Sequence, residues 1–355
     1  TVYPGLFDGL SRLGLVEVGQ GAPGTVDTNE TGDVNPHAKA WVALHPDSEL
    51  ISVARAFGIT TALSAPGGGL ISGQSAVIRT IGDTPMALTV KGPAAMHMSY
   101  PSGAPVIDFS QGFPNLEPKT FEQRQQDKKK NQEKELSRLH GLIEEARAFG
   151  GGLDAGLSEK VDLPMEALSL AASGKIPVVM RANAEADIKG AINFANDNKL
   201  KLIIAGAAEA WRCTDELKKN DVAVLIGVEQ LPTREGDPYD AAYANAATLH
   251  KAGIRFAIVT DDASNSRNLP FEAAMAFAFG LPREAALRAI TLSPAEIFGV
   301  ASMLGSIEVG KAATLIMTNG DILDHRTSIT NVIIDGREAS LDNKHQRLYE
   351  RYKAR

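Results

Sequence analysis

The chain has 355 residues, of which 44% are hydrophobic and 22% charged, proportions typical of a globular protein with a large core. Its formal charge of −7 arises from 36 basic and 43 acidic residues, which argues against a nucleic-acid-binding protein. No apolar run approaches the length of a membrane helix, and one cysteine excludes an intrachain disulfide framework or a multi-cysteine zinc site.

The chain opens with "TVYPGLFDGLSRLGL", which is typical of a strand that ends in a turn. It lacks a starting methionine and begins inside this predicted strand. We therefore expect a processed or partial chain from which an upstream segment has been removed.

Short β-branched or apolar runs then alternate with helical patterns. Strands are predicted at 58–66, 75–82, 86–94, 175–183, 201–208, 222–227 and 254–262. Helices are predicted at 185–198, 209–220 and 239–252. Such alternation implies a parallel sheet, and the length favours an eight-stranded β/α barrel. An open nucleotide-binding sheet is the alternative, but no dinucleotide or phosphate-loop motif follows a predicted strand.

Two segments depart from this alternation. The sequence "PGGGLISG" (66–73) lacks the Lys and Ser/Thr of a phosphate loop, and we interpret it as a tight loop at the barrel mouth. Residues 117–148 form a charged helical insertion, apolar only in their latter half. The pattern favours a solvated helix, and a partner-binding helix is the alternative.

The pattern changes again after residue 284, where two helices broken at Pro294 precede short strands. We therefore predict an α/β fold with a (β/α)8 TIM-like barrel over residues 1–303. A small C-terminal β-sandwich portion is predicted over 304–340, and a helical tail over 341–355.

Four segments of the chain form recognisable motifs: "AALRAITLSPAEIFGVASMLGSIEVGKAATLIM" and "NVIIDGRE" near the end, "YPGLFDGLSRLGL" at the start and "VTDD" in the last predicted strand. Together they resemble the motifs of the amidohydrolase superfamily, in its imidazolonepropionase-like branch. The resemblance implies a barrel with a small β-sandwich built from both chain ends. It also places residue 3 in the first barrel strand, so the strands in 304–340 should need an upstream segment, a partner chain or a homo-oligomer to complete their sheet.

Hydrolases of the family that the chain resembles hold one or two divalent metals with histidines and a carboxylate at the strand ends. At the matching positions this chain has Leu10, Arg12, His97, Arg181, Gly206 and Asp261, or its neighbour Asp262. An arginine does not deprotonate to bind a metal. The resemblance and its substitutions together predict no metal and no other cofactor.

The candidate site has Asp261 as its catalytic residue and five pocket-lining residues, namely Arg12, His97, Arg181, Asn183 and Glu209. Three arrangements stay open: an arginine–aspartate pair in the volume of the metals, a pocket for a small anionic ligand such as a carboxylate, or metal-free acid–base chemistry by Asp261 and His97. Glu209 has a second interpretation as a helix-start carboxylate, and Cys213 is expected to be a core thiol.

We therefore expect a catalytically degenerate family member, a pseudoenzyme that serves as a binding or structural subunit of a larger assembly. The alternative is a hydrolase acting on C–N bonds, amide or peptide-like, of a small substrate through an unconventional or partner-completed site. No membrane span and no nucleic-acid partner are expected, and the setting is expected to be periplasmic or secreted, in a bacterium.

Overall fold

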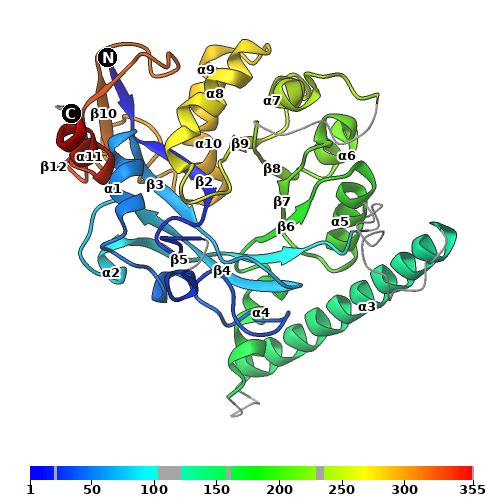
Figure 1. The fold of residues 1–355 in the computed structure, drawn as a ribbon. Helices are drawn as coiled ribbons and strands as arrows, with labels where there is room; N and C mark the ends of the chain where they lie inside the picture. Colours follow the sequence, from blue (N-terminus) through cyan, green and yellow to red (C-terminus); the bar gives the residue numbers. More distant parts are fainter. Residues whose placement is uncertain (20–21, 103–120, 157–160, 229–235, 354–355) are drawn as a thin grey trace, which may run out of the picture.

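The computed structural model of the chain describes residues 1–19, 22–102, 121–156, 161–228 and 236–353. Its strands form two sheets (Figure 1). The larger sheet consists of β2 (Leu6–Ser11), β3 (Ile59–Ser64), β4 (Ile71–Arg79), β5 (Thr89–Ser99), β6 (Val178–Ala182), β7 (Leu202–Gly206), β8 (Ala223–Ile226) and β9 (Phe256–Ile258), in that order. The smaller sheet consists of β1 (Val2–Pro4), β10 (Leu315–Thr318), β11 (Ile329–Ile334) and β12 (Arg337–Ala339).

Helices lie around the larger sheet (Figure 1). The α-helices are α1 (Glu49–Ala56), α2 (Pro85–Leu88), α3 (Phe121–Asp154), α4 (Leu163–Ala172), α5 (Glu185–Asp197), α6 (Thr214–Lys219), α7 (Ala241–Ala252), α8 (Leu269–Ala278), α9 (Arg283–Ala289), α10 (Leu292–Ile297) and α11 (Lys344–Tyr352). The 3-10 turns are η1 (Pro23–Thr25), η2 (Ala40–Val42), η4 (Ala210–Arg212) and η5 (Ser266–Asn268).

The larger sheet is the predicted TIM-like barrel, with one departure from the expected parallel arrangement. Strand β4 runs antiparallel to both β3 and β5, whereas the other paired neighbours in this sheet are parallel. Short connections allow this, because antiparallel strands need no crossover helix. Residues 86–88, predicted as strand, instead form part of α2 in the connection from β4 to β5.

The seam between the first and last barrel strands is closed by hydrogen bonds and by packing. Asp261 donates its backbone N–H to the carbonyl of Leu10 (2.9 Å), and Phe7 donates to the carbonyl of Ile290 (2.8 Å). Gly9 allows close packing here, since a Cβ at this position would lie 3.2 Å from both Val259 and Pro294. Strands β2 and β9 therefore meet where α10 packs against both of them.

The core has two parts. Inside the barrel, inward-facing residues such as Phe7, Leu225 and Val259 pack together, and Phe298 adds its ring beneath Phe7 at 6.5 Å between centroids. Outside, the helices pack on the outward face of the strands, where Ile78, Met96 and Ile204 are fully buried. Burial on both faces explains why the strand runs are continuously apolar.

Two predicted helices differ in detail. Pro294 does not break a helix: α9 ends at Ala289, and Pro294 lies in the first turn of α10. Proline is tolerated there because backbone N–H groups in the first turn have no intrahelical acceptor, so the N–H that proline lacks is not needed. The helix predicted over 209–220 consists of η4 followed by α6, which begins after Cys213.

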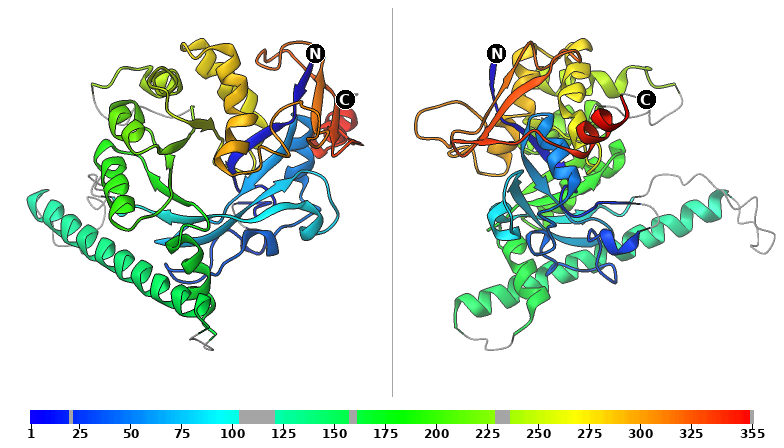
Figure 2. Two further views of the ribbon diagram at one scale, coloured as in Figure 1. Left: turned by 180° about the vertical axis from the view of Figure 1, so that it is seen from behind. Right: turned by 60° about the vertical axis from the view of Figure 1, so that its left-hand side comes forward.

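The charged insertion predicted over 117–148 forms α3, which begins at Phe121. Residues 117–120 of the predicted insertion lie outside the described residues. The latter half of α3 packs on α4 and buries Leu139, Ile143 and Ala146. Its first half extends beyond the body of the barrel (Figure 2). The apolar stripe expected in the latter half is therefore confirmed.

The smaller sheet corrects one expectation. Residue 3 does not lie in the first barrel strand, because β1 pairs antiparallel with β10. Tyr3 is buried there, and its hydroxyl lies 3.4 Å from Asp321 and 3.3 Å from Arg283. The C-terminal strands therefore have a partner strand from the start of the chain. Both chain ends lie at this side of the molecule (Figure 1).

Gly5 connects β1 of the smaller sheet to β2 of the barrel, and the close packing at this connection requires a glycine. A Cβ at this position would lie 2.1 Å from the Oγ1 of Thr60, which is buried in β3. We expect Gly5→Ala to lower the free energy of unfolding by about 2 kcal/mol, because the packed strands leave no room for a methyl group. Chemical denaturation measures this. Gly141→Ala on the exposed side of α3 is the matched control, and a similar loss in both variants would contradict the steric explanation.

Candidate functional site

The candidate site lies where the barrel strands end, the edge at which barrels of this kind carry their chemistry. A small cavity of about 40 Å³ opens there. It is lined by Leu10, Arg12, Pro66, Gly67, Gly68, Ser72, His97, Met98, Ser99, Val179, Arg181 and Ala205. Residues 66–70 therefore form a loop at the mouth, as predicted, whereas 71–73 already belong to β4.

Arg181 and Asp261 form a bidentate ion pair across the mouth. Arg181 donates from Nη1 to Oδ2 of Asp261 (2.6 Å) and from Nη2 to Oδ1 (2.8 Å). The side chains are 40% and 32% exposed, so solvent screens the pair in part. Paired fork geometry of this kind fixes both side chains in orientation as well as in distance.

The loop after β9 holds Asp261 in an unusual backbone conformation. Its φ of +53° is left-handed, a region that aspartate tolerates better than most residues. The preceding Thr260 donates to Asp8 from its backbone N–H (3.1 Å) and from its hydroxyl (2.5 Å). Ser11 in β2 bonds both Ser266 and the carbonyl of Asp262. The first barrel strand therefore positions the loop that carries Asp261.

Asp8 was not among the predicted site residues. It is fully buried, and burial raises the pKa of its carboxyl to about 7 despite the hydrogen bonds from Thr260 and Leu10. In the sequence it follows an apolar run in "GLFDG", which signals a carboxyl inside a strand. The sequence does not show its partner, since Thr260 is 252 residues away.

His97 lies in β5, on the barrel interior, and is almost completely buried. Its Nε2 has no hydrogen-bond partner in the part of the chain that the structure describes. Burial and the nearby charge of Arg181 lower the pKa of its imidazole to about 3. His97 is therefore neutral at physiological pH.

Arg12 follows β2 and is half-buried beside the mouth loop. A Cβ added to Gly67 would lie 3.3 Å from its Nη2, so the guanidinium lies close over this glycine. Within the described ranges Arg12 takes part in no hydrogen bond or ion pair. Arg12 and His97 thus line one cavity with Arg181, and Arg181 is ion-paired with Asp261.

The remaining predicted pocket residues lie away from this cavity. Asn183 is exposed beyond β6, and its Oδ1 would be 2.2 Å from a Cβ added to Gly206. Glu209 is buried, and its Oε2 accepts the backbone N–H of Glu185 (2.7 Å). Because Ala184 at the start of α5 offers no side-chain cap, Glu209 caps that helix from outside. The helix-start interpretation of this carboxylate fits, although the helix concerned is α5.

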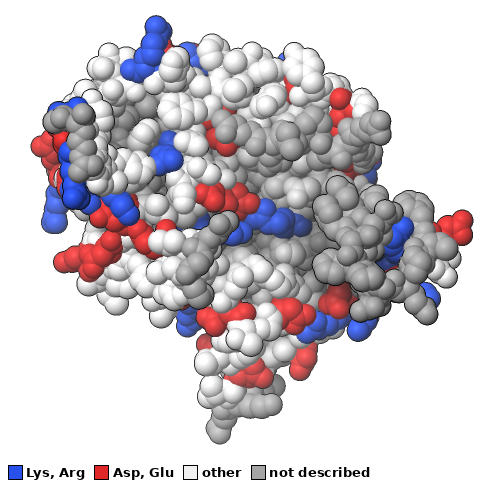
Figure 3. Space-filling view, viewed as in Figure 1, with Lys and Arg blue, Asp and Glu red and all other residues white. Residues whose placement is uncertain are grey.

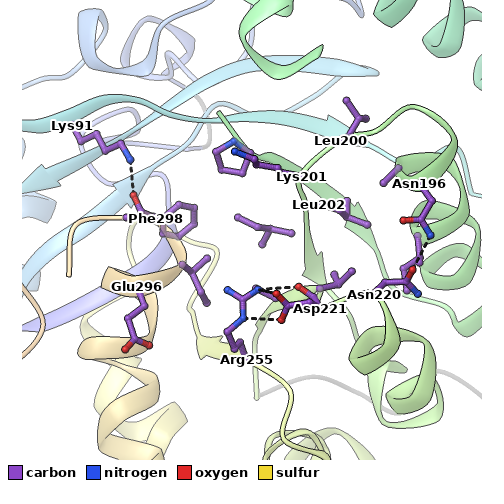
Figure 4. A pocket seen from close by; sticks show the side chains of 18 residues that line it. Lys91, Asn196, Leu200, Lys201, Leu202, Asn220, Asp221, Arg255, Glu296 and Phe298 are labelled. Atoms are coloured by element: carbon purple, nitrogen blue, oxygen red, sulfur yellow. Dashed lines mark hydrogen bonds and ion pairs between the residues drawn. The ribbon is translucent and has the colours of Figure 1, made fainter. Parts of the chain in front are cut away.

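A larger cavity of about 470 Å³ lies at the opposite end of the strands (Figure 4). It is lined by the first residues of β7 and β8 and by Arg255, which precedes β9. Its cations are largely paired: Arg255 binds Asp221, and Lys91 donates to the carbonyl of Phe298. That end of a barrel generally contributes to stability, so we place the candidate site in the smaller cavity.

Four further properties of the described residues bear on function: metal-ligating groups, surface charge, membrane-spanning helices and the one cysteine. Among the described residues no group of three or more His, Cys, Asp and Glu comes together as a metal site would require. Basic and acidic side chains are interspersed over the face shown in Figure 3. No described helix has both the length and the apolarity needed to cross a bilayer. Cys213 is buried, as expected.

Known proteins with similar sequences and structures agree with this fold. A sequence profile described as "Amidohydrolase family" matches residues 240–339. The structure of an amidohydrolase from Thermotoga maritima MSB8 is similar to this chain with a TM-score of 0.80 and 27% identity, over 96% of this chain and 87% of that one. These comparisons support the amidohydrolase superfamily as the family of this chain.

Two further proteins that are similar to this chain differ in length and in degree of likeness. Amidohydrolase tasK from Hapsidospora irregularis is 25% identical over 94% of this chain, which spans 36% of the length of that protein. A molinate hydrolase structure has a TM-score of 0.52 and 15% identity, over 96% of this chain and 83% of that one, and supports the fold alone.

The buried carboxyl of Asp8 gives a pH dependence of stability. Its folded pKa of about 7 lies above its ordinary value of 3.8, so the folded chain keeps a proton that the unfolded chain loses between these values. Stability should therefore fall as pH rises through this window, with a slope of up to about 1.4 kcal/mol per pH unit, and level off above pH 7. Urea unfolding across the window measures it. Asp8→Asn should flatten the profile and exposed Asp47→Asn should not; equal profiles in all three proteins would refute the assignment.

The cap on α5 gives a second expectation. Glu209→Ala should lower the free energy of unfolding by about 1 kcal/mol, because the N–H of Glu185 loses its acceptor. Glu209→Gln keeps an oxygen acceptor and should lose less. Thermal unfolding of both variants tests this, and an unchanged melting temperature in Glu209→Ala would argue against the cap.

Proposed function

We propose that this barrel is a catalytically degenerate member of its superfamily that acts as a metal-free binding or structural subunit. The observation that carries the proposal is the bidentate pair of Arg181 and Asp261 at the mouth. A guanidinium has no lone pair to offer a metal, and its fixed positive charge repels a divalent cation.

The other positions that resemble metal-ligand positions support the same conclusion. Leu10 is buried and belongs to the apolar interior of the barrel. Gly206 has a φ of +86°, and a Cβ there would meet Asn183. Neither position offers a ligand, so the donors left at the mouth are His97 and Asp261. This set does not fit a divalent metal, because the carboxylate already has a counter-charge in Arg181.

A small anionic ligand is part of the proposal. Arg12 adds a positive charge to a cavity in which Arg181 is already neutralised by Asp261. A role as one part of a larger assembly, with a partner chain or a second copy, is also part of the proposal. A periplasmic or secreted setting remains our expectation.

A hydrolase acting on C–N bonds is the second candidate. It is favoured by Asp261, whose carboxylate is 32% exposed at the mouth and held in a left-handed backbone conformation of the kind that gathers at functional sites. Such an enzyme would need further catalytic groups from another chain or segment, or an unconventional mechanism.

Metal content and turnover separate the candidates. We expect purified protein to hold less than stoichiometric zinc, iron or manganese by elemental analysis, with no chelator-sensitive hydrolysis of an amide and dipeptide panel. Asp261→Asn is the matched variant. Stoichiometric metal that falls in Asp261→Asn, together with chelator-sensitive turnover, would falsify the metal-free proposal. Turnover that is unaffected by chelators but is lost in Asp261→Asn would establish the hydrolase candidate instead.

A further inference from the structure

Two polar groups in the mouth cavity are not engaged by the rest of the described chain. The guanidinium of Arg12 lies over Gly67 without a hydrogen-bond or ion-pair partner in the described ranges. His97 lines the same cavity from β5, and its buried Nε2 is likewise unpartnered among the residues described. His97 is 6% exposed, so its ring is fixed inside the barrel. Buried polar groups are normally hydrogen-bonded, so the unpartnered imidazole of His97, with the half-buried and unpaired Arg12 beside it, points to a ligand.

The charge of the cavity restricts the class of that ligand. The charge of Arg181 is balanced by Asp261 through two hydrogen bonds. The imidazole of His97 is neutral, because burial and the charge of Arg181 hold its pKa at about 3. One positive charge, that of Arg12, is left without a counter-charge among the described residues of the cavity. This favours a monoanion over a doubly charged group such as phosphate.

The size of the cavity restricts the class further. Its volume is about 40 Å³. A single water requires roughly 10–15 Å³ on the same measure, so there is room for about three small atoms. A planar carboxylate matches this size, and a tetrahedral oxyanion is larger. A guanidinium fork also matches a carboxylate in geometry.

We propose that the cavity binds the carboxylate head group of a small monocarboxylic acid, with Arg12 as its charged partner and the neutral imidazole of His97 as a second donor. The proposal rests on the proposed function and assigns it a ligand class. Arg181 remains paired with Asp261 and forms one wall of the cavity, while the rest of the ligand extends out through the mouth.

The test uses the whole chain and three probes of defined chemistry. Acetate, acetamide and inorganic phosphate are titrated while the imidazole resonances of His97 and the melting temperature are followed. Acetamide has the shape of acetate without its charge. We expect acetate to shift the His97 resonances, and we expect acetamide and phosphate to bind about tenfold more weakly or worse, the ratio that one charge-assisted hydrogen bond supplies.

A matched pair of variants assigns the charge. Arg12→Gln should weaken acetate binding about tenfold or more. Lys201→Gln removes the same charge from the cavity at the opposite end of the barrel and should leave acetate binding unchanged. Equal losses in both variants would show a non-specific charge effect and overturn the site. The wild-type His97 resonances keep the test decisive even where Arg12→Gln does not fold.

The pH profile tests the role of His97. The Asp8 carboxyl, whose pKa is about 7, titrates between about pH 6 and 8, so the profile is measured in Asp8→Asn. A neutral donor then predicts a constant acetate affinity, because the imidazole does not titrate in this range. Affinity that still rises as pH falls in Asp8→Asn would show a protonated His97 and overturn its assigned role.

The remaining outcomes separate this inference from the proposed function. Phosphate binding as tightly as acetate, and depending on Arg12, would overturn the carboxylate class while supporting an anion pocket. Absence of anion binding together with stoichiometric metal at Asp261 would overturn both proposals. Absence of both anion and metal would overturn the ligand assignment and leave a structural subunit.

Discussion

The contact between the Asp8 carboxyl and Thr260 is the interaction on which the arrangement of this molecule depends most. The hydrogen-bonded ladder of the described strands begins at β2 and ends at β9. Asp8 joins these two ends by accepting both polar hydrogens of Thr260, and Asp261 adds its own N–H to the carbonyl of Leu10. The barrel closes here by side-chain chemistry, and the same contact fixes the loop that presents Asp261 to the mouth. Burying a carboxyl is costly, which is why the pKa of Asp8 rises to about 7.

Once the barrel is closed, the strand ends bring cationic and anionic groups into one small volume. Arg181 from β6 faces Asp261 from the loop after β9, and each supplies the counter-charge that the other requires. At two positions that resemble metal-ligand positions, Leu10 packs in the apolar interior and a Cβ added to Gly206 would meet the side chain of Asn183. The electrostatics of the mouth are therefore balanced by the chain's own residues, apart from Arg12.

The sequence predicts most of the strands and the meeting of Arg181 with Asp261, because the ends of parallel strands converge at one edge of a barrel. It does not predict the reversed direction of β4, since a strand pattern carries no information on direction. The sequence also wrongly places Glu209 in the pocket lining. A carboxylate near the start of a helix gives the same sequence pattern whether it caps its own helix or, as Glu209 does, the neighbouring α5. The pairing of Asp8 with Thr260 is invisible in the sequence because the two residues are distant along the chain.

The same geometry weighs against acid–base catalysis by the residues at the mouth. A general base must hold a free lone pair near the reacting proton and a pKa near the working pH. Both carboxylate oxygens of Asp261 already accept a hydrogen bond from Arg181, which leaves one lone pair on each oxygen and holds the carboxylate beside a fixed positive charge. His97 is available, but its pKa of about 3 makes its imidazole a weak base at neutral pH. Its neutral N–H is better suited to donating a hydrogen bond to the proposed anion than to moving protons. The paired Asp261 and the neutral His97 therefore support the proposed binding role of the mouth.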